Sequence, residues 1–516
     1  MRPLHISCCG ITVLLAVAIA AVQQAHAQLE VEYEGGITAN AGTQSLAPYY
    51  IASNRGGTVT QQYGLLADAA LSHSLDTTRR ASWGFGAEVW AGAASSADYD
   101  RYNAKQDGFY PNAQHPARVW IQQLYAEVKY RGVFATLGAK QLHSPIVSQR
   151  LSSGDIVMSG NAKPGAGFNI GFVNFQNIPF TRGELQIVGQ MGYYRLGDGG
   201  WLNHHYNGYN HFLTTGYWLN YKSCHFRTRP TRPLVLTIGA QAACQFAGTQ
   251  RKYEKGRLVK TVKMEADAKA FFRSLIAGSG GSNPGDSYVE GNHLGSWDVV
   301  LEYKLPHRGM VRGYYQSPWE DGSSIGKQNG FDGLWGLEYR SGSQGMVSGV
   351  ALEYLDFTNQ CGPVHFSKDD HPNSVLKDHS TGADNYYNNY AYNGYQNRGM
   401  SIGTPFVKSP LYNRDGYLRY TDNLLRGFHA AVMGTVSDEV GYRAMLSYRR
   451  AWGALEFPRH KSVTATSLML EATVTPHRVR NLTIKAQWAC DWGSLYGHNA
   501  GGLVSISYHG HLNLLK

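Results

Sequence analysis

The sequence predicts an all-β protein, a transmembrane antiparallel β-barrel of about eighteen strands with long outer loops and a short helical segment. Three observations predict this fold. Segments that alternate apolar and polar residues recur along the chain, and their connections alternate between short and long. An export signal begins the chain, and no later stretch has the roughly 18 consecutive apolar residues of a membrane helix.

The segment from Ile121 to Gln141 shows the repeating unit most clearly. Arg131 and Gly132 form a two-residue turn between two alternating runs, which is typical of a β-hairpin. The apolar positions are Leu124, Ala126, Val128, Tyr130, Val133, Ala135, Leu137 and Ala139. Each run has the length of a tilted strand that crosses a bilayer.

Eighteen such strands are expected along the chain. They are Leu29–Ala41, Tyr63–Leu75, Ser82–Gly92, Val119–Tyr130, Val133–Gln141, Phe168–Phe175, Glu184–Arg195, His211–Phe226, Leu234–Phe246, Ser296–Lys304, Met310–Ser317, Gly333–Arg340, Met346–Phe357, Gly427–Val436, Val440–Arg449, Thr464–Thr475, Leu482–Asp491 and Gly501–His511.

The lengths of the connections distinguish a barrel from a soluble sandwich. Short turns such as Asp76–Ala81 and Pro476–Asn481 alternate with long loops such as Ala93–Arg118, Leu142–Gly167 and Thr358–Arg426. Short turns at one rim and long loops at the other are typical of bacterial outer-membrane barrels. An even strand number then places both chain ends at the short-turn rim.

The N-terminus predicts export to the outer membrane. Arg2 precedes an apolar segment, Ile11–Val22, and Ala25–Ala27 provides a small-x-small cleavage pattern. We expect residues 1–27 to be a cleaved signal peptide and residues 28–516 to form a single outer-membrane β-barrel domain.

Composition and charge indicate which classes of binding partner are compatible with the chain. The chain has 60 Gly, 34 Tyr and 11 Trp, and 16% of its residues are charged, with a net charge of +10. A basic exported protein can attract the phosphates and carboxylates of lipopolysaccharide or of an acidic polysaccharide, although the charge is equally consistent with no such partner. Export, and the lack of Lys/Arg runs with interleaved aromatics, argue against nucleic acid. No disulfide framework is expected among Cys224, Cys244, Cys361 and Cys490.

Other features add detail to the barrel. Tryptophans near strand ends are expected at the membrane interfaces, with core packing as the alternative: Trp83, Trp90, Trp120, Trp297, Trp335, Trp452 and Trp492. Met264–Ala277 has helical spacing and is expected to cap or plug the barrel. Asn359–Tyr420 is a long loop with too many tyrosines for simple disorder.

No catalytic constellation, metal site or cofactor motif is predicted. The chain lacks G-x-S-x-G, G-x-x-x-x-G-K-[ST], H-E-x-x-H and C-x-x-C patterns. His204, His205 and His211 lack a Cys or carboxylate at ligand spacing. We therefore expect a protein that is not an enzyme, with an outer-membrane hydrolase as a minor alternative.

The long loops instead offer groups that suit sugars. Apolar faces of sugar rings lie on aromatic rings, and hydroxyls pair with amides and carboxylates. Two short windows supply both kinds of group, which predicts a polysaccharide-binding site at Trp319, Glu320, Asp321, Asp384, Asn385, Tyr386, Tyr387 and Tyr390. The alternative is that these tyrosines simply pack the loops over the barrel mouth.

Several stretches also resemble the capsule-assembly Wzi family of outer-membrane proteins, in the form found in Bacteroides-like bacteria. The matching stretches are Arg150–Asp155 (RLSSGD), Phe175–Phe180, Gly291–Asp298 (GNHLGSWD), Pro318–Tyr339, Glu353–Pro363 (EYLDFTNQCGP), Gly382–Asn389 (GADNYYNN), Gly399–Phe406, Gly427–His429 and Tyr448–Gly453. The resemblance implies an eighteen-stranded barrel occluded by loops and helical segments, which holds capsular polysaccharide as a lectin-like anchor. It carries over no individual binding residue.

The sequence thus predicts a monomeric, non-catalytic outer-membrane barrel that binds capsular or other surface polysaccharide and helps to anchor or assemble the capsule. The alternative is a porin or diffusion channel for small solutes.

Overall fold

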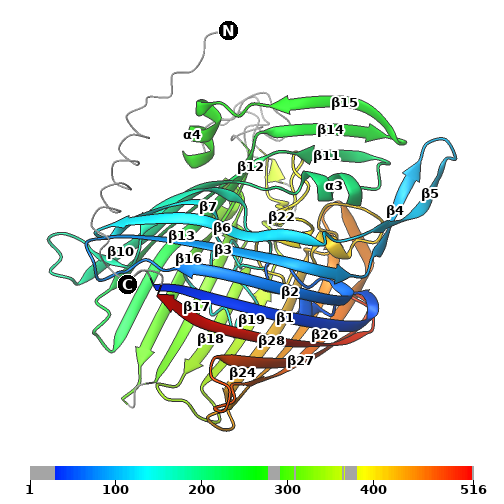
Figure 1. Cartoon of the computed structure of the whole chain (residues 1–516). Coiled ribbons are helices and arrows are strands. Elements are labelled where there is room, and N and C mark those ends of the chain that lie inside the picture. The colour runs from blue at the N-terminus through cyan, green and yellow to red at the C-terminus, as the bar shows by residue number, and fades with distance from the viewer. Residues whose placement is uncertain (1–29, 277–290, 307–308, 363–364, 367–379, 514–516) are drawn as a thin grey trace, which may run out of the picture.

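A computed structural model describes residues 30–276, 291–306, 309–362, 365–366 and 380–513. Its main feature is a closed antiparallel β-barrel of eighteen strands, in which β1 pairs with β28 and so joins the two ends of the sheet (Figure 1). Glu30 and Asn513 are partners in this closing register. A two-residue strand, β9 (Gln176–Asn177), adds to β10 beside β8.

The wall strands run in chain order around the barrel. They are β1 (Glu30–Leu46), β2 (Gln61–His73), β3 (Ala81–Ala94), β6 (Val119–Tyr130), β7 (Val133–Ala139), β8 (Ala166–Phe172), β10 (Leu185–Arg195), β12 (Trp218–Thr228), β13 (Leu234–Phe246), β16 (Asn292–Lys304), β17 (Met310–Trp319), β18 (Gly333–Arg340), β19 (Gly349–Asp356), β24 (Leu425–Thr435), β25 (Val440–Ala454), β26 (Phe457–Val474), β27 (Leu482–Trp492) and β28 (Asn499–Asn513).

Shorter elements belong to the connections between wall strands. The strands are β4 (Ala97–Asn103), β5 (Gly108–Gln114), β11 (His211–Thr215), β14 (Gly248–Glu254), β15 (Arg257–Met264), β20 (His365–Phe366), β21 (Ser380–Thr381), β22 (Gln396–Asn397) and β23 (Met400–Ser401). The helices are α2 (Tyr49–Ala52), α3 (Gly199–His205), α4 (Ala268–Ile276), α5 (Gly322–Ile325) and the 3-10 turn η2 (Pro410–Tyr412). Among the described residues, no helix is long and apolar enough to cross a membrane.

Each of the eighteen predicted strands corresponds to one wall strand, which confirms the predicted fold class. The prediction was wrong in treating residues 211–226 as one strand. Gly216 has a φ of +72°, so the chain bends there, and β11 leaves the wall to pair with β14. The predicted loops also contain hairpins that alternation did not reveal, including the β4–β5 arm that projects beyond the rim (Figure 1).

Alternation correctly predicted which faces of the strands are apolar. On β6, Leu124 and Tyr130 are exposed on the outside, whereas Glu127 and Lys129 lie buried toward the lumen. On β26, Leu470 faces outward, whereas Glu471 faces inward and forms an ion pair with Arg443 of β25 at 2.8 Å. Outward apolar and inward polar residues are the pattern of a barrel in lipid.

The tryptophan prediction was wrong at two positions. Trp90 pairs in register with Trp120, between the outward-facing pair Val89 and Ile121 and a second outward residue, Val119. Both tryptophans therefore face the lumen, where they stack at 6.0 Å between ring centroids and pack against the core. Regular alternation places Trp90 on the same face of β3 as Glu88, whereas an extra residue in β6, Gln122, shifts the register between Ile121 and Gln123 and turns Trp120 inward. In contrast, Trp297 and Trp335 are exposed on the outside of the wall.

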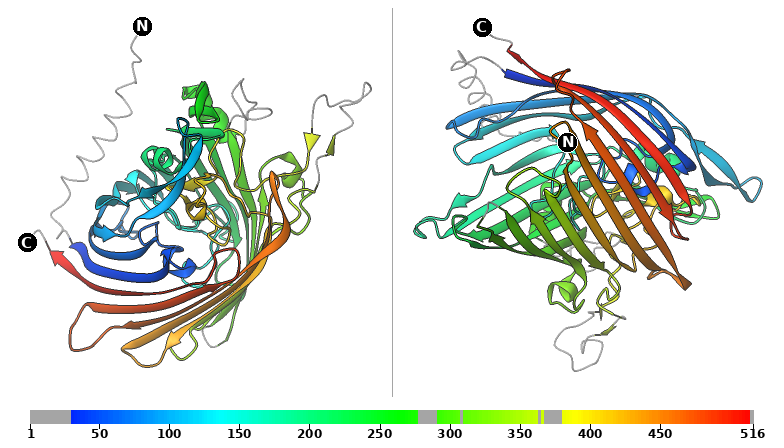
Figure 2. Two further views of the ribbon diagram at one scale, coloured as in Figure 1. Left: turned by 90° about the vertical axis from the view of Figure 1, so that its right-hand side faces the viewer. Right: turned by 90° about the horizontal axis from the view of Figure 1, so that it is seen from below.

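The hydrophobic core lies inside the barrel, because three segments fold into the lumen. Residues 46–60, which include α2, enter beside β27, and residues 142–165 and 384–424 fill most of the remaining space (Figure 2). The 142–165 segment reaches far toward the short-turn rim, where the side chain of Arg443 donates to the carbonyl of Arg150 at 2.9 Å. We call residues 142–165 the luminal loop. Among the described residues, these segments pack against one another and against the inner wall in the lumen.

Helix α4 forms where helical spacing predicted it, but it neither caps nor plugs the barrel. It rests on the outside of the wall, with Phe271 against Tyr193, Trp218 and Phe246. Trp218 shares its strand face with the exposed Cys224, and Phe246 shares its face with the exposed Ile238, so this is the outward surface. The prediction failed because helical spacing identifies an apolar stripe but not the surface that the stripe meets.

No disulfide bond joins the four cysteines among the described residues. Cys244, Cys361 and Cys490 are buried and Cys224 is exposed.

Candidate functional site

A cleft of about 460 Å³ lies at the long-loop rim, between the inner wall and the loops that fill the barrel. The wall contributes Trp120 and the residues around Gln61, and the loops contribute Lys163, Trp201 and residues 397–400. Two exposed residues, His115 and His204, also line it, so the cleft opens outward. We call this the mouth cleft.

Two tryptophans of the mouth cleft are held by neighbouring side chains. Trp120 stacks on Trp90, and its indole nitrogen donates to Oε1 of Gln122 at 3.0 Å. Trp201 of α3 stacks on His205, with ring centroids 4.3 Å apart. A ring that is already fixed loses little conformational entropy when a ligand packs on it, so both tryptophans are suited to a ligand with an apolar face.

Three amide atoms of the cleft are buried and have no hydrogen-bond partner among the residues that the structure describes. They are Oε1 of Gln61, Nε2 of Gln114 and Oδ1 of Asn397. Leaving a buried polar atom unpaired costs about 1–3 kcal/mol, and native proteins tolerate few such atoms. Their residues line the cleft, and rotation of these side chains would bring the donor and the acceptors to the hydroxyl groups of a ligand.

The cleft is also positively charged. Lys163 and Arg398 line it, and none of its described lining residues is a carboxylate. Burial, followed by the charge of nearby Arg398, lowers the pKa of Lys163 to about 8. A bound anion would relieve the repulsion between these two cations.

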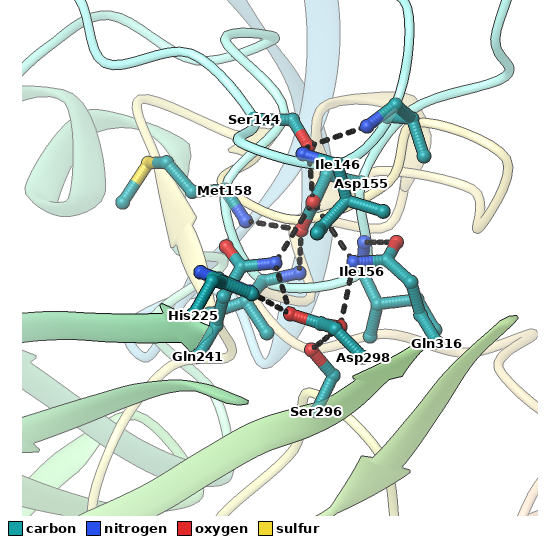
Figure 3. A network of polar contacts seen from close by, with 12 residues as sticks. Ser144, Ile146, Asp155, Ile156, Met158, His225, Gln241, Ser296, Asp298 and Gln316 are labelled. Carbon is teal, nitrogen blue, oxygen red and sulfur yellow. Dashed lines mark hydrogen bonds and ion pairs between the residues drawn. The ribbon is translucent and has the colours of Figure 1, made fainter. Parts of the chain in front are cut away.

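The luminal loop that carries Lys163 is fixed by a buried polar network (Figure 3). Gln241 of β13 and Gln316 of β17 each donate to Oδ2 of Asp155, at 3.0 and 2.9 Å, and both also donate to Asp298 of β16. His225 of β12 lies 2.8 Å from the same Asp298. Each of these side chains is at most 1% exposed, so the network anchors the loop and is closed to solvent.

Three of the stretches that resemble the Wzi family meet around this loop. Asp155 ends one of them, and Asp298 ends another. Glu353 begins a third and accepts hydrogen bonds from the hydroxyl of Ser152 at 2.6 Å and the backbone of Ser153 at 2.7 Å. These motifs therefore have a structural role in this chain: they attach the luminal loop to the wall.

The structure brings several of the sequence-predicted site residues together, but away from the mouth cleft. Glu320 accepts a hydrogen bond from the backbone of Tyr387 at 2.8 Å, and Asp321 caps α5 through the backbone of Ser323. Cys361 donates to Asp384 at 3.0 Å. Burial, followed by the charge of Asp321, raises the pKa of Asp384 to about 6. Burial, followed by the charge of Asp384, raises the pKa of Glu320 well above its usual value.

The predicted aromatic residues divide between inside and outside. Tyr386 and Tyr387 are 1% and 2% exposed, so neither ring can stack on a sugar in this conformation. Trp319 ends β17 on the outward face, near Trp297. Asn385 is half-buried and accepts hydrogen bonds from Asn388 and Asn423. Only Tyr390, at 68% exposed, presents its ring freely, so tyrosine packing explains most of this loop.

Sequence reasoning missed the residues that line the mouth cleft. Gln61, Gln114, Lys163, Trp201 and Arg398 lie far apart in the chain and belong to no shared motif. The sequence indicates Trp120 only as an aromatic residue near a strand end. The described residues contain no group of three or more His, Cys, Asp or Glu side chains that could hold a metal ion.

A second, larger hollow of about 790 Å³ lies at the short-turn rim, between the luminal loop and the turns. Its lining includes Arg150, Arg340, Asp438 and Glu439, charges of both signs, and no tryptophan. It lacks the combination of aromatic faces and unpaired amides that distinguishes the mouth cleft.

Comparison with known proteins supports the fold. No family model matches the chain. No curated protein matches it. Among solved structures, Wzi, an outer membrane protein involved in group 1 capsule assembly in Escherichia coli and a carbohydrate-binding β-barrel, is similar with a TM-score of 0.53 and 13% identity, over 98% of this chain and 89% of that one.

Two further solved structures are similar at TM-scores below 0.5. OccAB2 of Acinetobacter baumannii gives 0.46 with 9% identity over 94% of this chain and 98% of that one. OccK3 of Pseudomonas aeruginosa gives 0.45 with 10% identity over 96% and 99%. At 13% identity the likeness to Wzi shows the fold alone, and this chain is thus an outer-membrane type of β-barrel with a Wzi-like fold.

Proposed function

We propose that this protein binds surface or capsular polysaccharide at the mouth cleft and helps to anchor or assemble the capsule, without catalysis. The observation that carries the proposal is the set of three unpaired amide atoms in a cationic cleft lined by two fixed tryptophans. Polysaccharides supply hydroxyls for the amides and apolar ring faces for the indoles. The sugar-binding role described for Wzi, the similar structure, agrees with it.

The charge of the cleft favours an acidic polysaccharide. Lys163 and Arg398 would pair with carboxylate or phosphate groups of the repeating unit, and charge-assisted hydrogen bonds are about twice as strong as neutral ones. A polymer offers the same group many times, so a weak individual site still retains the chain.

The cellular setting is part of the proposal. A signal peptide over residues 1–27, which lies outside the described residues, would direct the chain to the outer membrane, where the barrel would be monomeric and in contact with lipopolysaccharide. Membership of the capsule-assembly Wzi family is likewise proposed, from the quoted sequence stretches and the similar fold. Of the tyrosines predicted from sequence, Tyr390 would contact the polysaccharide, because its side chain is exposed and those of Tyr386 and Tyr387 are buried.

The alternatives are a porin and, less favoured, an outer-membrane hydrolase. The packed lumen argues against a porin, because the luminal loop and residues 384–424 occupy the path that solutes would take. A hydrolase would need a reactive group in the cleft, and its described lining offers neither a carboxylate nor a nucleophile beside a base.

The experiment compares binding and conductance of one purified preparation. Polygalacturonate serves as the acidic polymer and dextran as the neutral one, and planar bilayers report the current. We expect binding of polygalacturonate, little binding of dextran and a silent barrel. Trp201→Ala should weaken polymer binding, whereas Trp335→Ala, on the outer wall, should not. A large steady current without polymer binding would establish the channel instead.

A further inference from the structure

Helix α4 lies on the outside of the barrel near the long-loop rim (Figure 1). Its inner side buries Ala270 and Ser274 and packs Phe271 among aromatic residues of β10, β12 and β13. The helix is therefore a fixed part of the outer surface of the wall.

Polar groups of the wall hold the last turn of α4 in place. The hydroxyl of Tyr193 donates to the carbonyl of Phe271 at 2.7 Å. Lys222, which also points outward from β12, donates to the carbonyl of Ser274 at 3.0 Å and to Oδ1 of Asn220 at 2.8 Å. A lysine on the lipid-facing side of a barrel is costly at membrane depth, and α4 satisfies its ammonium group. Lys222 therefore holds α4 against the wall, and α4 in turn provides the hydrogen-bond acceptor that Lys222 needs there.

The other side of α4 is apolar and exposed. Phe272 and Ile276, one helical turn apart, are 60% and 57% exposed. Lys269 is exposed one turn before Phe272, toward the start of the helix. Further along the same two strands, the outward residues Ile238 and Phe226 are also exposed, so the exposed apolar side of the helix extends the outward apolar surface of these strands toward the long-loop rim.

From this continuity we infer that α4 is a membrane-interface helix whose partner is the lipid of the outer leaflet. Phe272 and Ile276 enter the acyl-chain boundary, and Lys269 meets the phosphate groups above it. Amphipathic helices of this kind lie in the plane of the membrane, with their apolar face about 5–10 Å into the boundary between headgroups and acyl chains. The helix would fix the depth at which the long-loop rim stands.

Site-directed spin labelling of the full chain in vesicles of phosphatidylethanolamine and phosphatidylglycerol tests this inference. In a Cys224→Ser background, labels are placed through Phe272→Cys and, separately, Ile276→Cys. Leu337→Cys on the outer wall is the lipid control, and Lys105→Cys on the β4–β5 arm is the water control.

We expect labels at 272 and 276 to be more accessible to oxygen than to a polar nickel chelate, as at 337 and opposite to 105. Preferential access of the chelate at both positions would overturn the inference. So would strong spin–spin broadening at 272 and 276, because it would show a second copy of the chain covering this face. Two positions are labelled so that a local effect of one substitution does not decide the result.

Discussion

Gln316 of β17 donates a hydrogen bond to Oδ2 of Asp155 at 2.9 Å, and this bond ties the luminal loop to the barrel wall. The same carboxylate oxygen receives Gln241 from β13. The loop then continues to Lys163 at the mouth, so a bond deep in the lumen supports the floor of the candidate binding site.

Replacing Asp155 should loosen the attachment of the luminal loop to the barrel wall. In Asp155→Ala, the amides of Gln241 and Gln316 lose a partner, and leaving buried groups unpaired costs about 1–3 kcal/mol. We expect a lower unfolding temperature and intermittent ionic current in planar bilayers. Asp438→Ala, on an exposed turn, is the matched control. An unchanged silent barrel in Asp155→Ala would mean that this network does not hold the loop.

The pH dependence of binding follows from Lys163. Its lowered pKa of about 8 means that the cation is present at neutral pH and is lost as the pH rises through that value. Binding of an acidic polymer should therefore weaken between roughly pH 7 and pH 9, where carboxylate groups on the polymer stay ionised. Titration calorimetry across this range measures the effect.

Lys163→Arg is the control for the pH experiment, because a guanidinium stays charged throughout the range. This variant should bind with an affinity that no longer falls with pH. If the wild type and Lys163→Arg lose affinity in parallel, another group is responsible.

Substitutions at Tyr387 and Tyr390 distinguish a role in packing the tyrosine-rich loop from a role in binding polysaccharide. Tyr387 donates from its hydroxyl to the carbonyl of Ile156 at 2.5 Å, so Tyr387→Phe should lower the free energy of unfolding by about 1–3 kcal/mol. Its polymer affinity should be unchanged. Tyr390→Ala, at an exposed position, should leave stability unchanged and weaken polymer binding. Thermal unfolding and polymer titration of both variants check these expectations, and weaker binding in Tyr387→Phe at full stability would restore that residue to the site.

The sequence predicted the wall well because a strand between lipid and a polar interior must alternate. Leu470 and Glu471 show this pattern on β26. The exceptions have local causes: an extra residue in β6, Gln122, turns Trp120 inward, and Gly216 redirects β11 out of the wall.

The candidate site was far less predictable. The mouth cleft joins Gln61, Lys163, Trp201 and Arg398, and only the packing of three separate segments inside the barrel brings them together. Local density of aromatic and acidic residues instead indicated the loop around Asp384. Many of those side chains satisfy one another, as Cys361 and Asp384 do, because a loop buried in a barrel needs its own polar partners.

The most direct test of the central claim compares polygalacturonate binding by the wild type, by Lys163→Gln with Arg398→Gln, and by the control Lys105→Gln. Each hydrogen bond to a charged group contributes about 1.5–3 kcal/mol, so we expect the double variant to bind at least about tenfold more weakly, with the control unchanged. Equal affinities for all three folded proteins would contradict the assignment of the mouth cleft as the polysaccharide site.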